Sequence, residues 1–146
     1  MTRYVYDDFK LIPHGNNARD VLWELIDGIF HMSPPPSTVH QELSGNLFLA
    51  LGNYLKQENK QCKIFTEPTN VYLDDNTVVR PDIFIICDVD RIRLGECIGI
   101  PDLIVEILSP NTKNKDLPGG DKFNLYRKYG LKEYWIVDPL SQLPTT

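Results

Sequence analysis

The chain has 146 residues, of which 42% are hydrophobic and 24% are charged, a balance typical of one globular domain with a sizeable core. No apolar run approaches the roughly 18 residues of a membrane-spanning helix, which counts against a membrane protein. Lys and Arg number 15 against 20 Asp and Glu, so the net charge is −5. The chain therefore lacks the basic excess of a dedicated, nonspecific nucleic-acid binder, although a small basic lining near a site is compatible with this charge.

The N-terminal stretch MTRYVYDDFKLIPHG is acidic and contains no apolar segment of the kind found in signal peptides. We therefore expect a cytoplasmic protein. The three cysteines are Cys62, Cys87 and Cys97. Their odd number and the absence of a CxxC pair count against a disulfide framework and a zinc site, so we expect reduced thiols.

The first elements are a hairpin and a long helix. The segment WELIDGIFHM alternates around Asp27-Gly28, a dipeptide that favours a two-residue hairpin turn. The prolines of SPPPST predict a loop over residues 33–38. An apolar residue then recurs at every fourth position, which predicts a helix over residues 37–60 with Ser37 or Thr38 as its N-cap. These apolar positions are Val39, Leu43, Leu47, Leu51 and Leu55.

The segments CKIFTEP and NVYLDDNTVVRPDIFIICD predict three strands, with a turn over residues 74–77 joining the second and third. Residues 88–100 are expected to form a loop or a short helix. DLIVEIL predicts a further strand, SPNTKNKDLPGG a polar loop, DKFNLYRKYG a helix that ends near Gly130, and KEYWIVDP a final strand. The last strand-helix-strand unit implies a parallel pair and the hairpins imply antiparallel pairs, so we expect a mixed α/β fold with a central mixed sheet flanked by helices.

Three charged residues stand in apolar surroundings. Glu106 shares a strand face with Ile104 and Leu108, because side chains alternate along a strand. Asp82 shares a face with Phe84 and Ile86 in the same way. Lys122 falls on the core-facing stripe of the last helix, together with Leu125, Tyr126 and Tyr129.

Each of these residues also has an ordinary structural explanation. Asp82 could end a turn after Pro81, Glu106 could lie on a wet face of the sheet, and Lys122 could extend its amine to solvent. Taken together they are harder to dismiss, because two buried acids repel each other unless a cation lies between them.

Two carboxylates beside a lysine are suited to phosphodiester hydrolysis. Carboxylate oxygens bind hard ions such as Mg²⁺ or Mn²⁺, and such an ion polarises a phosphate and acidifies a bound water. Lys122 can stabilise the water or the developing negative charge. Glu67 is a candidate further metal ligand, or else an exposed acid at a strand end. His40, one residue off the helical stripe, is a candidate accessory residue, or else a hydrogen-bonded structural histidine.

The segments RPD, VEILSPNT and DKFNLYRKYGLKEYWIVDP resemble the bacterial Uma-type restriction endonuclease family of the PD-(D/E)XK nuclease superfamily. WELIDGIFHMSPPPSTVHQELSGNLFLAL resembles the N-terminal part of that family, so the resemblance spans residues 22–139. It implies a restriction-endonuclease-like fold, a magnesium-dependent site and DNA as the substrate.

Carried over by motif, the resemblance makes Asp82 the motif aspartate and Glu106 the acid of the second motif. The superfamily lysine would lie two residues later, where this chain has Leu108. In families of this type the lysine is found on the following helix, which points to Lys122. Lys113 and Lys115 are weaker candidates because they lie in the loop.

Members of the family generally continue with further strands after the segment that resembles EYWIVDP. We therefore expect a single domain over residues 1–146 that is truncated at its C-terminus, with an exposed sheet edge that a homodimer would cover. Two other functions stay open. One is a catalytically inactive nucleic-acid-binding module on the nuclease scaffold, and the other is a protein-interaction domain.

Overall fold

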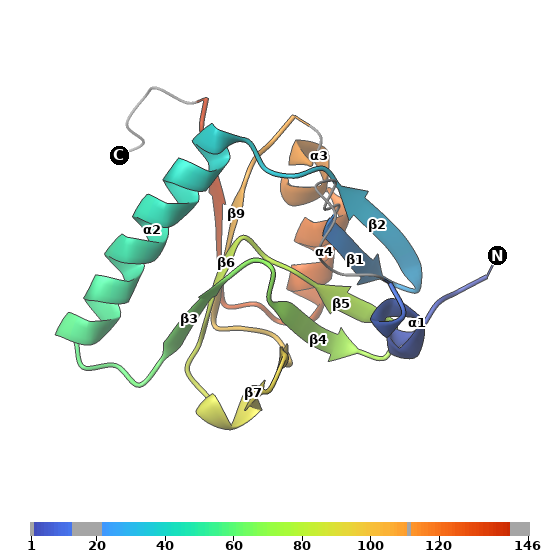
Figure 1. Cartoon of the computed structure of the whole chain (residues 1–146), viewed down its shortest axis with the longest axis horizontal. Helices are drawn as coiled ribbons and strands as arrows, with labels where there is room; N and C mark the ends of the chain where they lie inside the picture. Colours follow the sequence, from blue (N-terminus) through green and yellow to red (C-terminus); the bar gives the residue numbers. More distant parts are fainter. Residues whose placement is uncertain (1, 13–21, 111, 141–146) are drawn as a thin grey trace.

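Two β-sheets form the centre of the molecule and helices pack against them (Figure 1). The structure, a computed structural model, describes residues 2–12, 22–110 and 112–140. The larger sheet has the strand order β2-β1-β5-β4-β8-β7 and the smaller sheet the order β10-β9-β6-β3. Both sheets contain parallel and antiparallel pairs. The predicted mixed α/β fold is therefore confirmed, with the strands divided between two sheets.

The N-terminal hairpin joins β1 (Leu22–Ile26) to β2 (Ile29–Ser33). Asp27 and Gly28 both have positive φ, 53° and 77°, as a tight two-residue turn requires. A short helix that the sequence analysis did not predict, α1 (Tyr6–Lys10), buries Phe9 against Leu25 of β1.

The predicted long helix is α2 (Thr38–Gln57), and Ser37 caps it by accepting a hydrogen bond from the His40 N–H at 3.1 Å. Residues 34–37 form the predicted proline-rich loop ahead of it. Leu47, Leu51 and Leu55 of α2 pack on the small sheet, where they cover Ile83, Ile85, Leu103 and Val105. The apolar stripe of the helix thus decides which face of α2 is buried.

The segment after α2 contains four strands where three were predicted. They are β3 (Lys63–Thr66), β4 (Asn70–Asp74), β5 (Thr77–Val79) and β6 (Ile83–Ile86). The prediction of one continuous strand through VVRPDIFII was wrong because Pro81 has no N–H for a strand ladder, and the chain crosses from the large sheet to the small one at this point. Asp82 is the last residue of that crossing.

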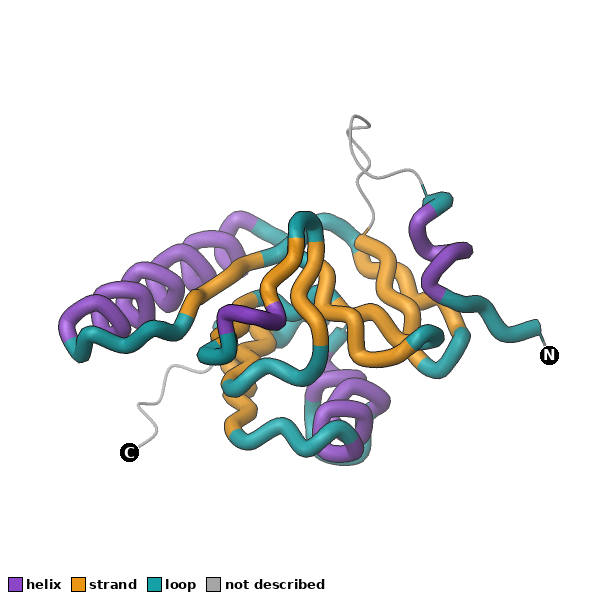
Figure 2. The backbone as a smooth tube through the Cα atoms, turned by 90° about the horizontal axis from the view of Figure 1, so that it is seen from below, coloured by secondary structure: helices purple, strands orange, loops and turns teal. Residues whose placement is uncertain are grey.

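Residues 88–100 contain a 3₁₀ turn (Val89–Arg91) and two short strands, β7 (Ile92–Arg93) and β8 (Glu96–Ile98), and are therefore more ordered than expected. The C-terminal strand-helix-strand unit follows the prediction, except that the predicted loop over residues 109–120 contains a short helix that includes Lys113 and Lys115. β9 (Leu103–Ile107) pairs in parallel with β10 (Glu133–Val137), and α3 (Lys113–Asp116) and α4 (Asp121–Lys128) connect them. Figure 2 shows α2 and α4 on opposite sides of the small sheet.

A core cluster joins the two sheets to α4. It contains Ile26, Val71, Val79 and Cys97 from the large sheet, Phe84, Ile86 and Ile104 from the small sheet, and Leu125 and Tyr126 from α4. This core fixes how the sheets lie relative to each other, and so it positions any side chains that meet between them.

The expectation of three reduced thiols was wrong. Cys62 and Cys87 form a disulfide, whereas Cys97 is a buried free thiol. The register of β3 and β6 explains the pairing, since Lys63 lies opposite Ile86 and the flanking cysteines therefore face each other. The cysteines consequently lend no support to a reducing compartment. None of the helices in the described part of the chain is both long enough and apolar enough to cross a membrane.

Candidate functional site

Three acids form a row across neighbouring strands of the small sheet. Thr66 of β3 lies opposite Ile83 of β6, and Ile83 lies opposite Val105 of β9. The next position along each strand places Glu67 and Glu106 on either side of Asp82. Cross-strand neighbours of this kind have side chains on the same face of a sheet. The register therefore brings together carboxylates that lie far apart in the sequence.

Backbone hydrogen bonds hold the row in place. The Asp82 N–H donates to Glu106 Oε1 at 2.9 Å, and the Ile107 N–H donates to Asp82 Oδ2 at 2.6 Å. The Glu67 N–H donates to the Asp82 carbonyl oxygen at 3.3 Å. Asp82 and Glu106 are thus each fixed by the backbone of the other's strand.

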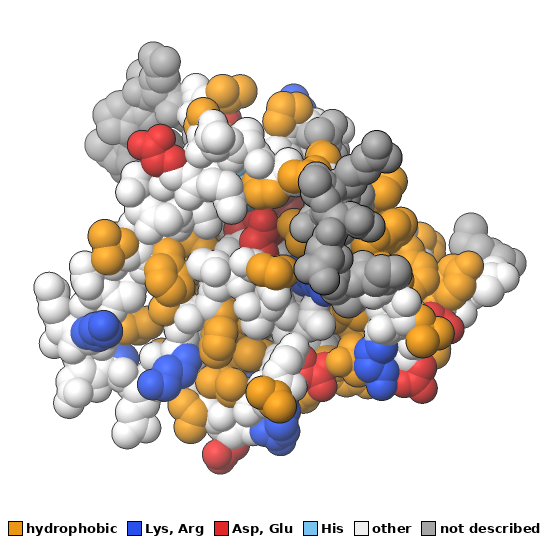
Figure 3. All heavy atoms as spheres, in the orientation of Figure 1, with side chains coloured by type: hydrophobic (Ala, Val, Ile, Leu, Met, Phe, Trp, Pro, Cys, Tyr) orange, Lys and Arg blue, Asp and Glu red, His pale blue; other side chains and the backbone are white. Residues whose placement is uncertain are grey.

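The row borders a cavity of about 170 Å³ between the two sheets. The proline-rich loop before α2 forms one wall, and the segment after β9, together with α3, forms the opposite wall. Figure 3 shows acidic side chains in a hollow near the middle of this face. All five residues named from the sequence line this cavity: His40, Glu67, Asp82, Glu106 and Lys122.

Lys122 lies at the buried end of the cavity and is 5% exposed. Its ammonium contacts Glu106 Oε2 and lies 3.0 Å from Glu24 Oε2. Glu24 is itself buried and accepts a hydrogen bond from the Arg80 N–H at 2.7 Å. The lysine is therefore held between one carboxylate from each sheet.

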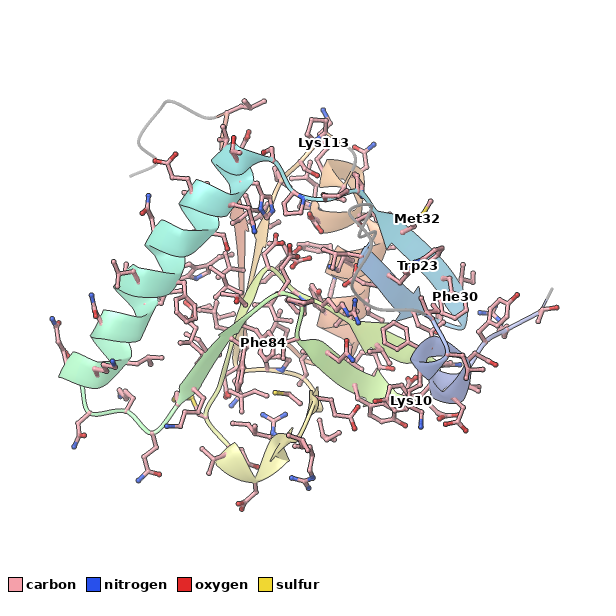
Figure 4. All side chains as sticks on the ribbon, in the orientation of Figure 1. Lys10, Trp23, Phe30, Met32, Phe84 and Lys113 are labelled. Atoms are coloured by element: carbon pink, nitrogen blue, oxygen red, sulfur yellow. A yellow bond between two sulfur atoms is a disulfide. The ribbon has the colours of Figure 1, made fainter. Side chains whose placement is uncertain are left out.

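The weaker lysine candidates lie elsewhere. Lys115 lines the cavity wall, whereas Lys113 is exposed at the start of α3 (Figure 4). Of these three amines, that of Lys122 is the one held against the acid row.

Burial opposes the charge of the Lys122 amine, but the carboxylates of Glu106 and Glu24 outweigh that effect and raise its pKa well above the usual value. Burial likewise raises the pKa of Glu106, and the nearby ammonium acts against that rise. The charged form of the pair is favoured, because neutralising one partner would leave the other buried without compensation.

Glu67 and Asp82 carry unequal charge. Burial, and then the charge of Asp82, raise the pKa of Glu67 from 4.5 to about 8. Burial would also raise the pKa of Asp82, but hydrogen bonds from His40 and from the Ile107 N–H lower it below its ordinary value. At neutral pH, Asp82 is therefore ionised and Glu67 holds a proton.

His40 approaches the row from the first turn of α2. Its Nε2 lies 3.4 Å from Asp82 Oδ1, and its Nδ1 lies 3.3 Å from Gln41 Oε1. The hydrogen bond with Asp82 raises the pKa of His40, and partial burial opposes this rise. The capped helix end thus points a proton donor at the central acid.

Sequence reasoning missed two acids that line the cavity. Glu24 lies inside the apolar strand of the hairpin, which is the same signal that drew attention to Glu106. Asp116 follows three polar residues in the predicted loop, where an acid is unremarkable, yet it is 3% exposed and its Oδ1 has no hydrogen-bond partner among the described residues. Burial raises the pKa of Asp116 to about 6.

Within the described residues, no group of three or more His, Cys, Asp and Glu side chains has the arrangement of a formed metal site. The oxygen donors nevertheless fit a hard divalent cation. Asp82, Glu106 and Glu67 lie side by side, burial and then the charge of Asp82 raise the pKa of Glu67 to about 8, and the Asp116 carboxylate has a buried oxygen with no hydrogen-bond partner among the described residues. Mg²⁺ and Mn²⁺ prefer carboxylate ligands and would relieve this crowding.

Comparison with solved structures supports the fold. The chain resembles the crystal structure of a putative nuclease belonging to DUF820 from Anabaena variabilis ATCC 29413, with 22% sequence identity and a TM-score of 0.69. The similarity covers 92% of this chain and 74% of that one. No curated protein sequence matches significantly. The model of the Uma2 family, described as a putative restriction endonuclease, matches residues 6–143, and the chain therefore belongs to this family.

Proposed function

We propose that the protein is a metal-dependent nuclease that hydrolyses DNA phosphodiester bonds at the cavity between the sheets. The observation that supports this most directly is the fixed pairing of Asp82 with Glu106, with the Lys122 ammonium in contact with the same acid. A buried arrangement of this kind is costly for a purely structural role. Membership of a family described as restriction endonucleases points to the same chemistry.

Asp82 and Glu106 would hold Mg²⁺ or Mn²⁺, with Glu67 as a further ligand once it has lost its proton. The bound ion would supply Lewis acidity toward a phosphate and toward an attacking water. The expected metal ligands are the carboxylates of the row, because the His40 imidazole is already engaged with Asp82.

The protein's own groups then position the reactants. Lys122 has a charged amine at a fixed place beside Glu106, where it can donate hydrogen bonds to a phosphate oxygen or to the attacking water. His40 orients the Asp82 carboxylate by donating to Oδ1, and the Ile107 N–H fixes the other oxygen. These contacts are in place before a substrate arrives, so little reorganisation is needed at the moment of reaction.

The test is cleavage of single-stranded and double-stranded DNA by the purified chain with Mg²⁺ or Mn²⁺. We expect Asp82→Ala and Glu106→Ala each to reduce cleavage by about 100-fold or more, the range typical of lost electrostatic stabilisation. Glu42→Ala, on the exposed side of α2, is the matched control and should retain full activity.

Two other results would argue against this function. Absence of cleavage with every divalent cation, together with absence of metal binding in calorimetry, would reject a nuclease. DNA binding that survives both alanine substitutions without any cleavage would instead support a non-catalytic nucleic-acid-binding module.

A further inference from the structure

Glu24 contacts the candidate catalytic lysine, although the sequence motifs of the site do not include it. It comes from β1 of the large sheet, whereas the acid row belongs to the small sheet. Its Oε2 lies 3.0 Å from Lys122 Nζ and accepts the Arg80 N–H at 2.7 Å. The carboxylate is therefore fixed by the backbone beside the amine, and it comes from a different sheet than Glu106.

This arrangement matters when a cation binds to Glu106. A divalent ion on that carboxylate would repel the nearby ammonium and compete with it for the same oxygens. If Glu106 were the only partner of Lys122, the ammonium would either prevent the cation from binding to Glu106 or be displaced from the cavity. Glu24 is a second carboxylate partner that the amine already contacts, so the amine need not move when Glu106 binds the cation.

We propose that Glu24 is a positioning residue that keeps Lys122 in the cavity and lets Glu106 exchange the ammonium for a divalent cation. The inference rests on the proposed function, since it assumes a cation at Asp82 and Glu106. Glu24 acts through Lys122 and has no assigned contact with the substrate. Its role is therefore distinct from that of the acid row.

The test is a double-mutant cycle read by calorimetric titration with Mn²⁺, which needs no catalysis. In Glu24→Gln the amine depends on Glu106 alone, and the Mn²⁺ Kd should rise about tenfold, a coupling of about 1.4 kcal/mol. Lys122→Met removes the competing ammonium and should tighten Mn²⁺ binding. In the Lys122→Met background, Glu24→Gln should have little further effect.

The conservative variant and the kinetics give independent readouts. Glu24→Asp keeps the charge and should restore part of the Mn²⁺ affinity that Glu24→Gln loses. Glu24→Gln should also lower kcat about 100-fold while KM for DNA changes little, because positioning of the amine matters most in the transition state. Thermal unfolding of each variant shows whether the fold is kept.

The failures can be told apart. If Glu24→Gln weakens Mn²⁺ binding equally with and without Lys122, Glu24 acts only as a distant negative charge and the positioning role is rejected. An unchanged Kd in Glu24→Gln rejects it as well. If the unsubstituted chain binds no Mn²⁺, the proposed function and this inference fall together. A Glu24→Gln variant that unfolds is replaced by Glu24→Asp, whose full loss of affinity would also count against the role.

Discussion

At the scale of single residues, the main property of the site is an excess of carboxylates over positive charges. Glu24, Glu67, Asp82, Glu106 and Asp116 line one small cavity. Lys122 neutralises part of this charge, and burial together with the charge of Asp82 raises the pKa of Glu67 to about 8, which favours a proton on that acid at neutral pH. The proposed cation would take the place of the proton on Glu67.

The proton on Glu67 predicts a pH dependence of stability in the absence of divalent ions. Its pKa is raised from 4.5 to about 8 on folding. Between these two pH values the folded chain therefore holds a proton that the unfolded chain has lost. The free energy of unfolding should therefore fall as pH rises through this window, by at most about 1.4 kcal/mol per pH unit, and the loss is complete above about pH 8.

Glu67→Gln removes this titration. The substituted chain should match the unsubstituted one near pH 4.5 and exceed its stability by the widest margin near pH 8. Urea unfolding at several pH values in the presence of a chelator measures the difference. Equal slopes of stability against pH for the two chains would show that Glu67 carries no such proton.

Much of this site was predictable because an acid or a lysine in an apolar pattern is a local signal. Asp82, Glu106 and Lys122 were found in that way. Asp116 was not, because its burial results from the packing of α3 against the cavity, which its polar neighbours in the sequence do not reveal. The contact between Glu24 and Lys122 was missed for a related reason, since it joins β1 to α4 and no local pattern encodes how these two elements pack.

At the scale of elements, β3 and β6 are tied together at both ends. The disulfide between Cys62 and Cys87 closes one end of the pair, and Glu67 and Asp82 stand opposite each other at the other end. Hairpins and helices were predictable from periodicity and turn residues. The disulfide was not, because it depends on the register of two strands that do not follow each other in the chain.

Loss of the disulfide should destabilise the fold without changing its topology. The cysteines are 25 residues apart, and the loop-entropy relation gives about 3.5 kcal/mol for a closure of this length. We expect the Cys62→Ser/Cys87→Ser double variant to unfold at correspondingly lower urea concentration. Reductant should shift the unsubstituted chain toward the variant and leave the variant unaffected. A chain that is insensitive to reductant would contradict this expectation.

At the scale of the whole molecule, the two sheets and α4 share one core. Phe84 is fully buried there and stacks on Phe65, with the ring centroids 5.3 Å apart. Because this core holds the sheets together, it also sets the distance between Glu24 and the acid row. The division into two sheets was not predicted, since the residues on both sides of Pro81 were assigned to one strand.

Phe84→Ala should therefore weaken both stability and metal binding. Truncation of a buried aromatic side chain costs about 3–5 kcal/mol, and the loosened sheets should also lower the affinity for Mn²⁺. Chemical unfolding and calorimetry measure the two effects. Leu49→Ala is the matched control, because Leu49 is 62% exposed on α2 and its loss should change neither quantity.

The crossing from Val79 to Ile83 has a consequence for how the family can vary in length. One additional amino acid inserted before Pro81 would lengthen the bridge yet leave the aspartate next to Ile83, still facing Glu106. The same residue inserted after Asp82 would itself occupy the position next to Ile83. The Asp82 side chain would then point toward the opposite face of the sheet. Two chains of identical composition, differing only in where the added residue stands, would then differ in whether the aspartate faces Glu106.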